Sequence, residues 1–318
     1  MKRFRRFLQW LMVASVTLSA LASEAEPQKV LWARTDFAPF FILKGPYQDQ
    51  GVGDQLIHFF ANTIEGYRHE PTQMSIKRVL QLLQDGVPLC HVAFLKTPSR
   101  DAFVEYSDPL MWLYANGVVT TKAMAEKLGH GEDNPPSVSL EQLRRRGLRL
   151  SVHDGRAYSP VIDAEIQREA QSDPSLFRVK TGLKETPRLL RMIELGQVDG
   201  IILRPEELNY EQMIGETRQP LQFLPLKNTQ LFSPTHVACT RGHWNDSLLN
   251  QVNERIRSGQ AVAIFTEAYS RWLPLALRDR FLQAVNSGEL YPMSDTPGTK
   301  RASRRSEEHL EPPQADTD

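Results

Sequence analysis

The residues best suited to bind a small ligand lie in the stretch "LKTPSRDAFVEYSDPL", from Leu95 to Leu110. Arg100 follows Thr97 by three residues, so a guanidinium and a hydroxyl are close together in the chain. A guanidinium offers two parallel N–H groups that match the two oxygens of a carboxylate. The residues alone leave a more ordinary interpretation open, in which Arg100 is a surface charge that pairs with Asp101 or Glu105.

Two aromatic residues, Phe37 and Phe40, flank Pro39 in the segment "DFAPFFI". Aromatic rings can cover the apolar part of a ligand and keep water from its charge. At least one of the two rings is therefore a candidate wall of a binding site, whereas Phe41 is expected in the core. A buried turn of the core would have the same composition, and that alternative stays open.

A third candidate is the turn "HDGRAYS", from His153 to Ser159, which follows an apolar strand. Backbone N–H groups at the start of a helix attract anions, and Arg156, next to Ala157, could add a positive charge there. An ordinary tight turn with an exposed arginine explains the same residues.

These candidates need a scaffold, and the first part of the chain predicts one. A strand at 29–36 is followed by a helix capped by Asp54, a helix from about Ser75, and the strand "LCHVAFLK". Two consecutive helices between strands imply parallel pairing through crossovers. The first segment is therefore expected to be α/β.

The same logic repeats further along the chain. Ser139 is expected to cap a helix before the strand "LRLSVHDG", and helices should follow Tyr158 and run from about Thr186 to Leu195. The strands "VDGIIL" and "SPTHVACTRG" come next, and two helices, "NDSLLNQVNERIRSG" and "QAVAIFTEAYSRWL", close the pattern.

Composition excludes some functions. The 318 residues, 41% hydrophobic and 24% charged, are enough for one large domain or two lobes. The 38 basic residues balance 38 acidic ones, so no excess charge favours a nucleic acid partner. Two cysteines cannot build a zinc site, and the eight histidines lack metal-ligand spacing, so no metal or other cofactor is expected.

The two ends of the chain differ from the rest. A basic start, an apolar run from Phe7 and the small residues Ala20 and Ala22 predict a signal peptide over residues 1–22, cleaved near Ala22. An N-terminal membrane anchor is the alternative, although Gln9 interrupts an apolar run that is short for a membrane span. The polar stretch 294–318 is expected to be a disordered tail.

Export to the periplasm would let Cys90 and Cys239 pair, provided that the fold brings them together. Two buried free thiols are the alternative.

Taken in order, these segments resemble the periplasmic solute-binding proteins of family 3, which includes the polar amino-acid receptors of ABC importers. The resemblance covers about Lys29 to Leu273. Six segments carry it: "DFAPFFI", "DQGVGDQL", "TPSRDAFVEYSDPL", "SLEQLRRRGLRLSVHDG", "LGQVDGIIL" and the closing pair of helices that ends at Trp272.

The resemblance implies an α/β, two-lobed periplasmic binding protein fold, in which each lobe is a mostly parallel sheet flanked by helices. Lobe 1 would comprise 23–118 and the return segment 235–293, and lobe 2 would comprise 119–234. Two extended crossovers would form a hinge, so that ligand binding closes the lobes. In this fold the strands that carry Cys90 and Cys239 are neighbours, which implies a disulfide.

The resemblance also assigns roles in the cleft. Arg100 matches the arginine that holds the ligand's carboxylate, and Thr97 matches the threonine that adds a hydroxyl. Arg204 stands where amino-acid receptors of this family carry the acid that receives the ligand's ammonium group. A ligand with two acidic ends, or with no amine, then fits better than a zwitterion, unless a shift in register gives the amine role to Glu206 or Glu207. The full set of expected ligand-binding residues is Arg100, Thr97, Phe37, Phe40, Leu95, Arg156, Ala157 and Arg204.

The function implied is capture of a small anionic or zwitterionic solute, an amino acid or related organic acid, for an ABC permease in the inner membrane. A monomer is expected. One alternative is a periplasmic lyase or dehydratase on the same fold, for which Glu185, Glu206 and Glu207 are the candidate acids of lobe 2. Another is an accessory sensor or partner module of a membrane complex.

Overall fold

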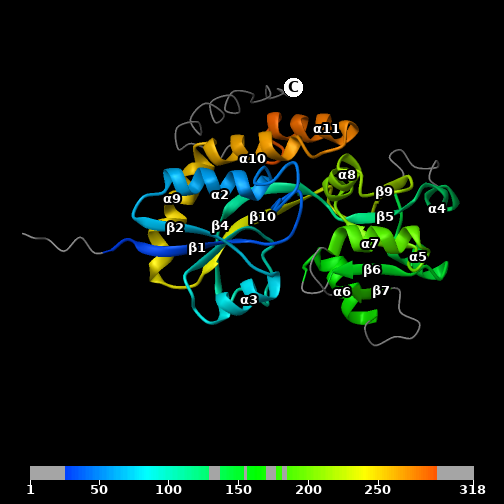
Figure 1. Ribbon diagram of the computed structural model, residues 1–318, viewed down its shortest axis with the longest axis horizontal. Coiled ribbons are helices and arrows are strands. Elements are labelled where there is room, and N and C mark those ends of the chain that lie inside the picture. The colour runs from blue at the N-terminus through cyan, green and yellow to red at the C-terminus, as the bar shows by residue number, and fades with distance from the viewer. Residues whose placement is uncertain (1–25, 129–136, 154–155, 170–176, 181–184, 292–318) are drawn as a thin grey trace, which may run out of the picture.

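A computed structural model describes residues 26–128, 137–153, 156–169, 177–180 and 185–291 (Figure 1). The predicted signal peptide with its cleavage site near Ala22 and the predicted tail at 294–318 lie outside these residues. Within them the chain forms two β-sheets, each with its own helices, joined side by side. The predicted α/β, two-lobed architecture is confirmed.

The sheet of lobe 1 has the strand order β2-β1-β3-β10-β4. Strands β1, β2 and β3 are parallel, and β10 runs antiparallel to both of its neighbours. The bounds are β1 Gln28–Arg34, β2 Tyr67–Gln73, β3 Leu89–Phe94, β4 Val104–Tyr114 and β10 Phe232–Thr240.

The sheet of lobe 2 repeats this layout in the order β7-β6-β8-β5-β9. Strands β6, β7 and β8 are parallel, and β5 runs antiparallel to β8 and β9. The bounds are β5 Gly117–Thr121, β6 Leu150–His153, β7 Phe177–Lys180, β8 Gly200–Leu203 and β9 Leu221–Pro225.

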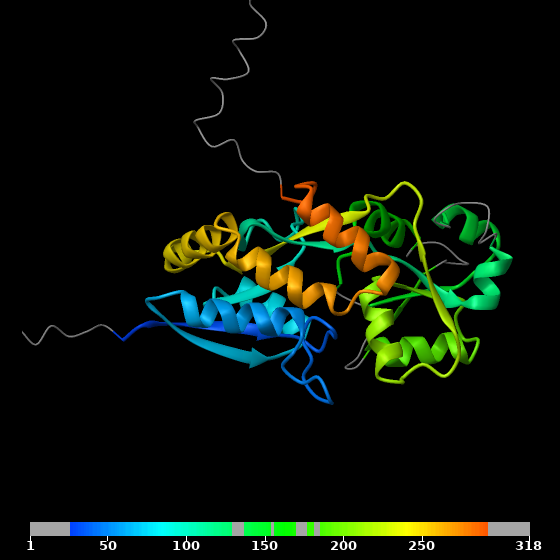
Figure 2. The same ribbon diagram turned by 90° about the horizontal axis from the view of Figure 1, so that it is seen from above.

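Helices cover both faces of the first sheet. Val30 and Trp32 of β1 face the core under α2 and α10, while Ala33 faces the smaller core under α3. This alternation follows from the two-residue period of a strand. Figure 2 shows the C-terminal helices α10 and α11 following one another across lobe 1. The helices of lobe 1 are α2 Val52–Thr63, α3 Ile76–Gln84, α9 Asp246–Arg257, α10 Gln260–Ser270 and α11 Leu275–Asn286.

Helices also follow or precede the strands of lobe 2. They are α4 Lys122–Lys127, α5 Leu140–Arg145, α6 Pro160–Glu169, α7 Glu185–Glu194 and α8 Pro205–Met213. Two of them, α4 and α5, are short, with 6 residues each. The predicted cap of α5 is confirmed, because the Ser139 hydroxyl accepts a hydrogen bond from the Gln142 N–H at 3.0 Å.

The chain passes between the lobes twice, from β4 to β5 and from β9 to β10. The two crossovers run side by side, since the Ala115 N–H donates to the Leu231 carbonyl at 2.9 Å. By strand membership, Gly117 and Val118 lie in the sheet of lobe 2, and residues 232–234 lie in that of lobe 1.

Several elements of the fold were not expected from the sequence, namely β2, α4, β7, α8, β9 and α11. The expectation of two consecutive helices was wrong, because β2 lies between α2 and α3. Its sequence "YRHEPTQ" is polar, since β2 is an edge strand without a fully buried side chain. Asp54 was expected to cap α2, but the N-cap residue is Gly51. Asp54 is the third residue of the helix, and its carboxylate accepts a hydrogen bond from the Gly51 N–H at 3.1 Å.

The start of α2 packs closely on the aromatic turn that follows β1. A Cβ added to Gly51 would lie 2.4 Å from the Phe40 carbonyl oxygen, and one added to Gly53 would lie 2.4 Å from the Phe41 ring. Both glycines of the segment "DQGVGDQL" are therefore required by close approach. This contact fixes the turn that carries Phe37.

The predicted disulfide between Cys90 and Cys239 is confirmed. The two residues are directly opposite each other in the antiparallel pairing of β3 with β10, and their Cα atoms are 4.1 Å apart. Both side chains are fully buried in the core of lobe 1. The bond therefore joins the early part of lobe 1 to its return segment.

Candidate functional site

The predicted site residues follow the carboxyl ends of four parallel strands. Phe37 follows β1 and Arg100 follows β3 in lobe 1, whereas Arg156 follows β6 and Arg204 follows β8 in lobe 2. In open α/β sheets, ligands bind in the crevice outside these ends. Two loops from neighbouring strands of each sheet are thus presented at the same edge.

Arg100 lies at the end of a turn after β3, where its N–H donates to the Thr97 carbonyl at 3.0 Å. Its guanidinium lies over the Phe94 ring, 4.7 Å from the centroid, and donates to the Leu95 carbonyl at 3.3 Å. Burial lowers the pKa of Arg100, and the nearby Tyr106 and Asp163 side chains oppose that shift. Asp163 belongs to α6, so the guanidinium interacts electrostatically with lobe 2.

The alternative ion pairs of Arg100 are not formed. Glu105 pairs with Arg241 at 3.4 Å, and the Asp101 carbonyl also accepts from Arg241. Among the described residues, no carboxylate forms an ion pair with Arg100. A cation with only a carbonyl partner can accept a carboxylate from a ligand.

Thr97 and Leu95 are both half-buried beside Arg100. The Thr97 hydroxyl lies 3.1 Å from the Ser99 hydroxyl, and either group can act as the donor. This leaves hydrogen-bonding capacity on Thr97 for a ligand oxygen. The ligand roles of both residues stay predictions.

The two rings around Pro39 differ in exposure. Phe37 is half-buried and stacks on Phe40, with centroids 4.9 Å apart. Phe40 has no exposed surface and packs toward Tyr269 in the core. In this structure Phe40 therefore supports Phe37 from behind and offers no wall of its own, and Phe41 lies in the core as expected.

Arg156 is not an exposed residue of a tight turn. Its guanidinium donates to both oxygens of Glu207, at 2.8 and 2.6 Å, and to the Asn116 amide oxygen at 3.2 Å. It also lies 4.9 Å from the Phe37 centroid and 5.0 Å from the Tyr158 centroid. Phe37 belongs to lobe 1, so Arg156 contacts lobe 1 directly from lobe 2. The adjacent Ala157 is half-buried, and its ligand role stays a prediction.

Arg204 caps the start of α8 and is 3% exposed. Its guanidinium donates to the Tyr114 carbonyl, at the end of β4 where the first crossover begins. Burial lowers the pKa of Arg204, and the carboxylate of Glu206 opposes that shift. Arg204 is thus engaged in an internal contact across the hinge here, and its predicted ligand contact stays a prediction.

The candidate acids of α8 are buried. Glu206 has no exposed surface, and neither of its carboxylate oxygens has a hydrogen bond of normal geometry, although the Tyr269 hydroxyl lies beside it. Burial raises the pKa of Glu206 to about 7, and Arg204 opposes this shift. Glu207 is fully engaged by Arg156, and the side chain of Glu185 lies outside the described residues.

Two residues of this arrangement, Asn116 and Tyr158, were not predicted from the sequence to belong to the site. Asn116 lies in the first crossover and joins Arg156 to the Tyr158 carbonyl, which accepts from its amide at 3.3 Å. The Tyr158 hydroxyl accepts from the His153 N–H at 2.7 Å, which closes the turn after β6. The one sequence feature that could have indicated Asn116 is that it is a polar residue within the crossover sequence "YANG".

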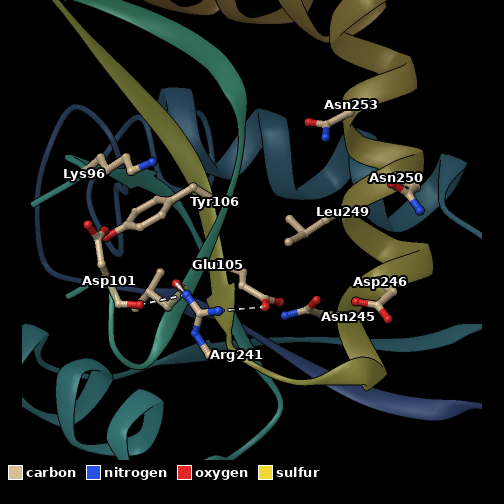
Figure 3. A pocket seen from close by; sticks show the side chains of 11 residues that line it. Lys96, Asp101, Glu105, Tyr106, Arg241, Asn245, Asp246, Leu249, Asn250 and Asn253 are labelled. Carbon is tan, nitrogen blue, oxygen red and sulfur yellow. Dashed lines mark hydrogen bonds and ion pairs between the residues drawn. The ribbon is translucent and has the colours of Figure 1, made fainter. Parts of the chain in front are cut away.

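A groove of about 750 Å³ lies elsewhere, between the edge strand β4 and helix α9 of lobe 1 (Figure 3). Figure 3 shows Arg241 of this groove paired with the Glu105 carboxylate and donating to the Asp101 backbone carbonyl. Lobe 2 contributes none of the residues that line this groove. It therefore differs in place and composition from the predicted interlobe site.

Two further observations concern the described residues. They contain no cluster of three or more His, Cys, Asp or Glu side chains arranged to hold a metal ion. None of the helices formed by those residues has the length and apolar character needed to cross a membrane.

No protein-family model matches the sequence, and no curated protein is significantly similar to it. Solved structures are similar in fold. An amino acid ABC transporter substrate-binding protein from Streptococcus pneumoniae, bound to L-arginine, is 17% identical with a TM-score of 0.55, over 76% of this chain and 94% of that one. The chain has the two-lobed fold of these binding proteins.

Two more structures agree with this fold. A probable amino-acid ABC transporter extracellular-binding protein from Bacillus subtilis is 13% identical, with a TM-score of 0.55, over 78% of this chain and 99% of that one. A structure describing glutathione import through a cystine ABC importer of Streptococcus mutans is 12% identical, with a TM-score of 0.58, over 80% and 100% of the two chains.

Proposed function

We propose that the protein is an exported solute-binding protein that captures a small carboxylate-bearing ligand between its lobes and delivers it to an ABC permease. The observation that carries the proposal is Arg100. It is a partly buried cation at the carboxyl end of a parallel strand, it interacts with lobe 2, and no described carboxylate forms an ion pair with it. Thr97 and Phe37 would complete the lobe 1 side of the site.

Binding explains the site better than catalysis does. A general acid or base must reach the reacting group of a substrate. Glu206 has a pKa near that of a useful proton donor, but it has no exposed surface, and Glu207 is held by Arg156. The two-lobed fold with paired crossovers supports a receptor that closes on its ligand. Export is supported by the internal disulfide.

The proposal is tested by thermal shift of the mature protein against amino acids, dicarboxylates and sugar acids, with the ligands recovered and checked by mass spectrometry. A ligand at ~100 times its Kd adds about 2.7 kcal/mol to the free energy of unfolding. Stabilisation by an intact ligand is expected, whereas conversion of the ligand would favour an enzyme.

Arg100→Ala should abolish the ligand-induced shift, because it removes the donor pair for the carboxylate. Arg241→Ala is the matched control, since it removes an arginine from the same lobe outside the interlobe site. An undiminished shift in Arg100→Ala would remove Arg100 from the site.

A further inference from the structure

We propose that Phe37, Tyr158, Glu207 and Asn116 form a guanidinium-binding site that the protein fills with its own Arg156, which excludes cationic groups of ligands from this part of the cleft. The geometry of these four residues carries the first part of the inference. The second part, concerning ligand choice, rests on the proposed function.

The site surrounds the guanidinium of Arg156 with complementary groups. The two rings lie 4.9 and 5.0 Å from its central carbon. Along its edge, Glu207 accepts two hydrogen bonds, at 2.8 and 2.6 Å, and Asn116 accepts a third at 3.2 Å. Aromatic faces and a bidentate carboxylate are the groups that recognise a free guanidinium in a binding site.

The four surrounding residues come from separate parts of the fold. Phe37 follows β1 in lobe 1, Asn116 lies in the first crossover, and Tyr158 and Glu207 belong to lobe 2. Residues from both lobes and from a crossover are expected around a ligand that binds between the lobes, whereas a contact within one turn would involve neighbouring residues only. Arg156 takes the place that the cationic group of a ligand would occupy.

The ion pair inside the site is strongly desolvated. The Arg156 side chain is 14% exposed and that of Glu207 is 0% exposed. Burial alone would lower the pKa of Arg156, but Glu207 outweighs it and raises the pKa. Burial alone would raise the pKa of Glu207, and Arg156 outweighs it in turn. Removing the arginine would leave a buried carboxylate without its ion-pair partner, although it would still accept a hydrogen bond from the Arg204 N–H at 3.0 Å.

A ligand amine is excluded by competition. Glu207 is one of the two acids to which a shift in register would give the role of ammonium partner, yet both of its oxygens are occupied by Arg156. A ligand cation would have to displace a group of the same chain, which is present at high effective concentration. Anionic ligands without an amine face no such competition at Arg100.

The test is chemical rescue of the Arg156→Ala variant with methylguanidinium chloride at millimolar concentration, followed by thermal shift. The variant should melt below the unmodified protein, and methylguanidinium should raise its Tm in a saturable manner. Sodium chloride at equal ionic strength should not. The unmodified protein should show no saturable shift, because its site is filled.

The double variant Arg156→Ala/Glu207→Gln is the matched control, and it should lose at least tenfold in affinity for methylguanidinium. If Arg156→Ala does not fold, Arg156→Gln is measured in the same way, since it keeps a side chain of intermediate length. The proposed guanidinium site would be overturned if methylguanidinium gave no saturable rise in the Tm of the folded Arg156 variant. It would also be overturned if the double variant showed an equal rise.

L-Arginine distinguishes the two parts of the inference. Arg156→Ala should bind L-arginine at least tenfold more tightly than the unmodified protein does; equal affinity would overturn the role of Arg156 in ligand choice. The rescue needs no natural ligand, so a failed ligand screen would count against the proposed function while leaving the guanidinium site standing.

Discussion

At the scale of single residues, the buried carboxylates of α8 differ in whether a cation neutralises them. Glu207 has Arg156, and Glu206 lies beside Arg204. Glu211 is 2% exposed, and its described neighbours add only negative charge. Burial first, and then Glu216, Glu207 and Asp36, raise the pKa of Glu211 to about 8.

Glu211→Gln should therefore stabilise the protein at alkaline pH. Because the pKa of Glu211 is higher in the folded state than in the unfolded state, the folded protein binds more protons between pH ~4.5 and ~8. Its contribution to stability is complete below pH ~4.5 and is lost as the pH rises through about 8. Urea unfolding at pH 9 should show the variant more stable by roughly 1–3 kcal/mol.

As the pH falls below ~4.5 the Glu211→Gln difference should approach zero, because the Glu211 carboxyl is then increasingly protonated in both the folded and the unfolded state. Glu216→Gln removes the exposed carboxylate that contributes most to this pKa shift after burial, so it should stabilise the protein at pH 9 in the same direction by a smaller amount. A Glu211→Gln effect equal at pH 9 and below pH ~4.5 would show that charge is not its cause.

At the scale of elements, α8 connects the lobes independently of the crossovers. Its chain segment follows β8 of lobe 2, yet Tyr210 is buried in the main core of lobe 1. The Tyr210 ring meets Trp272 edge to face at 5.5 Å between centroids, and the Asn209 amide donates to the Trp272 carbonyl at 2.9 Å. Motion of the lobes must therefore either carry α8 along or break this contact.

Tyr210→Ala should loosen the lobes. The truncation leaves a cavity against Trp272 and should lower the free energy of unfolding by about 3–5 kcal/mol. Small-angle X-ray scattering should show a larger radius of gyration for the folded variant. Tyr210→Phe keeps the ring and should retain both the stability and the dimensions of the unmodified protein. Unchanged scattering by Tyr210→Ala would mean that the crossovers alone hold the lobes.

The elements also show what could be predicted from the sequence. Strands β1, β3, β6 and β8 were predicted because they are short apolar runs that end in polar turns. Strand β2 was missed because an edge strand buries little and lacks the apolar pattern. Helix α8 was missed although Pro205 and two acids mark its start, because three of its six buried residues are acidic and the sequence therefore lacks an apolar pattern at helical spacing.

The candidate site was predictable only in part. The loops of Arg100 and Arg156 could be placed, since each follows a recognisable strand. The partner of Arg156 could not be predicted, because Glu207 is 51 residues away and meets it only through the pairing of β6 with β8. The interior position of Phe40 depends on packing against α10, which neighbouring residues do not reveal.

At the scale of the whole molecule, the disulfide joins two segments separated by 149 residues. Cys90→Ala/Cys239→Ala should lower the free energy of unfolding by roughly 2–5 kcal/mol, because the unfolded chain regains the freedom of a long loop. The measurement is urea unfolding of the double variant beside the unmodified protein, each with and without reductant.

Reductant should destabilise the unmodified protein and leave the double variant unchanged. Titration of the denatured protein should find no free thiols before reduction and two after it. Two thiols before reduction would contradict the disulfide.

The position of β10 has a consequence for how the protein is made. It lies between β3 and β4, although it follows the entire second sheet in the chain. As synthesis proceeds from the N-terminus, β3 and β4 emerge early but have no direct pairing with each other. The strands of lobe 2, which lie between Gly117 and Pro225, all become available before β10, the strand that joins β3 to β4. The lobe that emerges first is thus the lobe that is completed last.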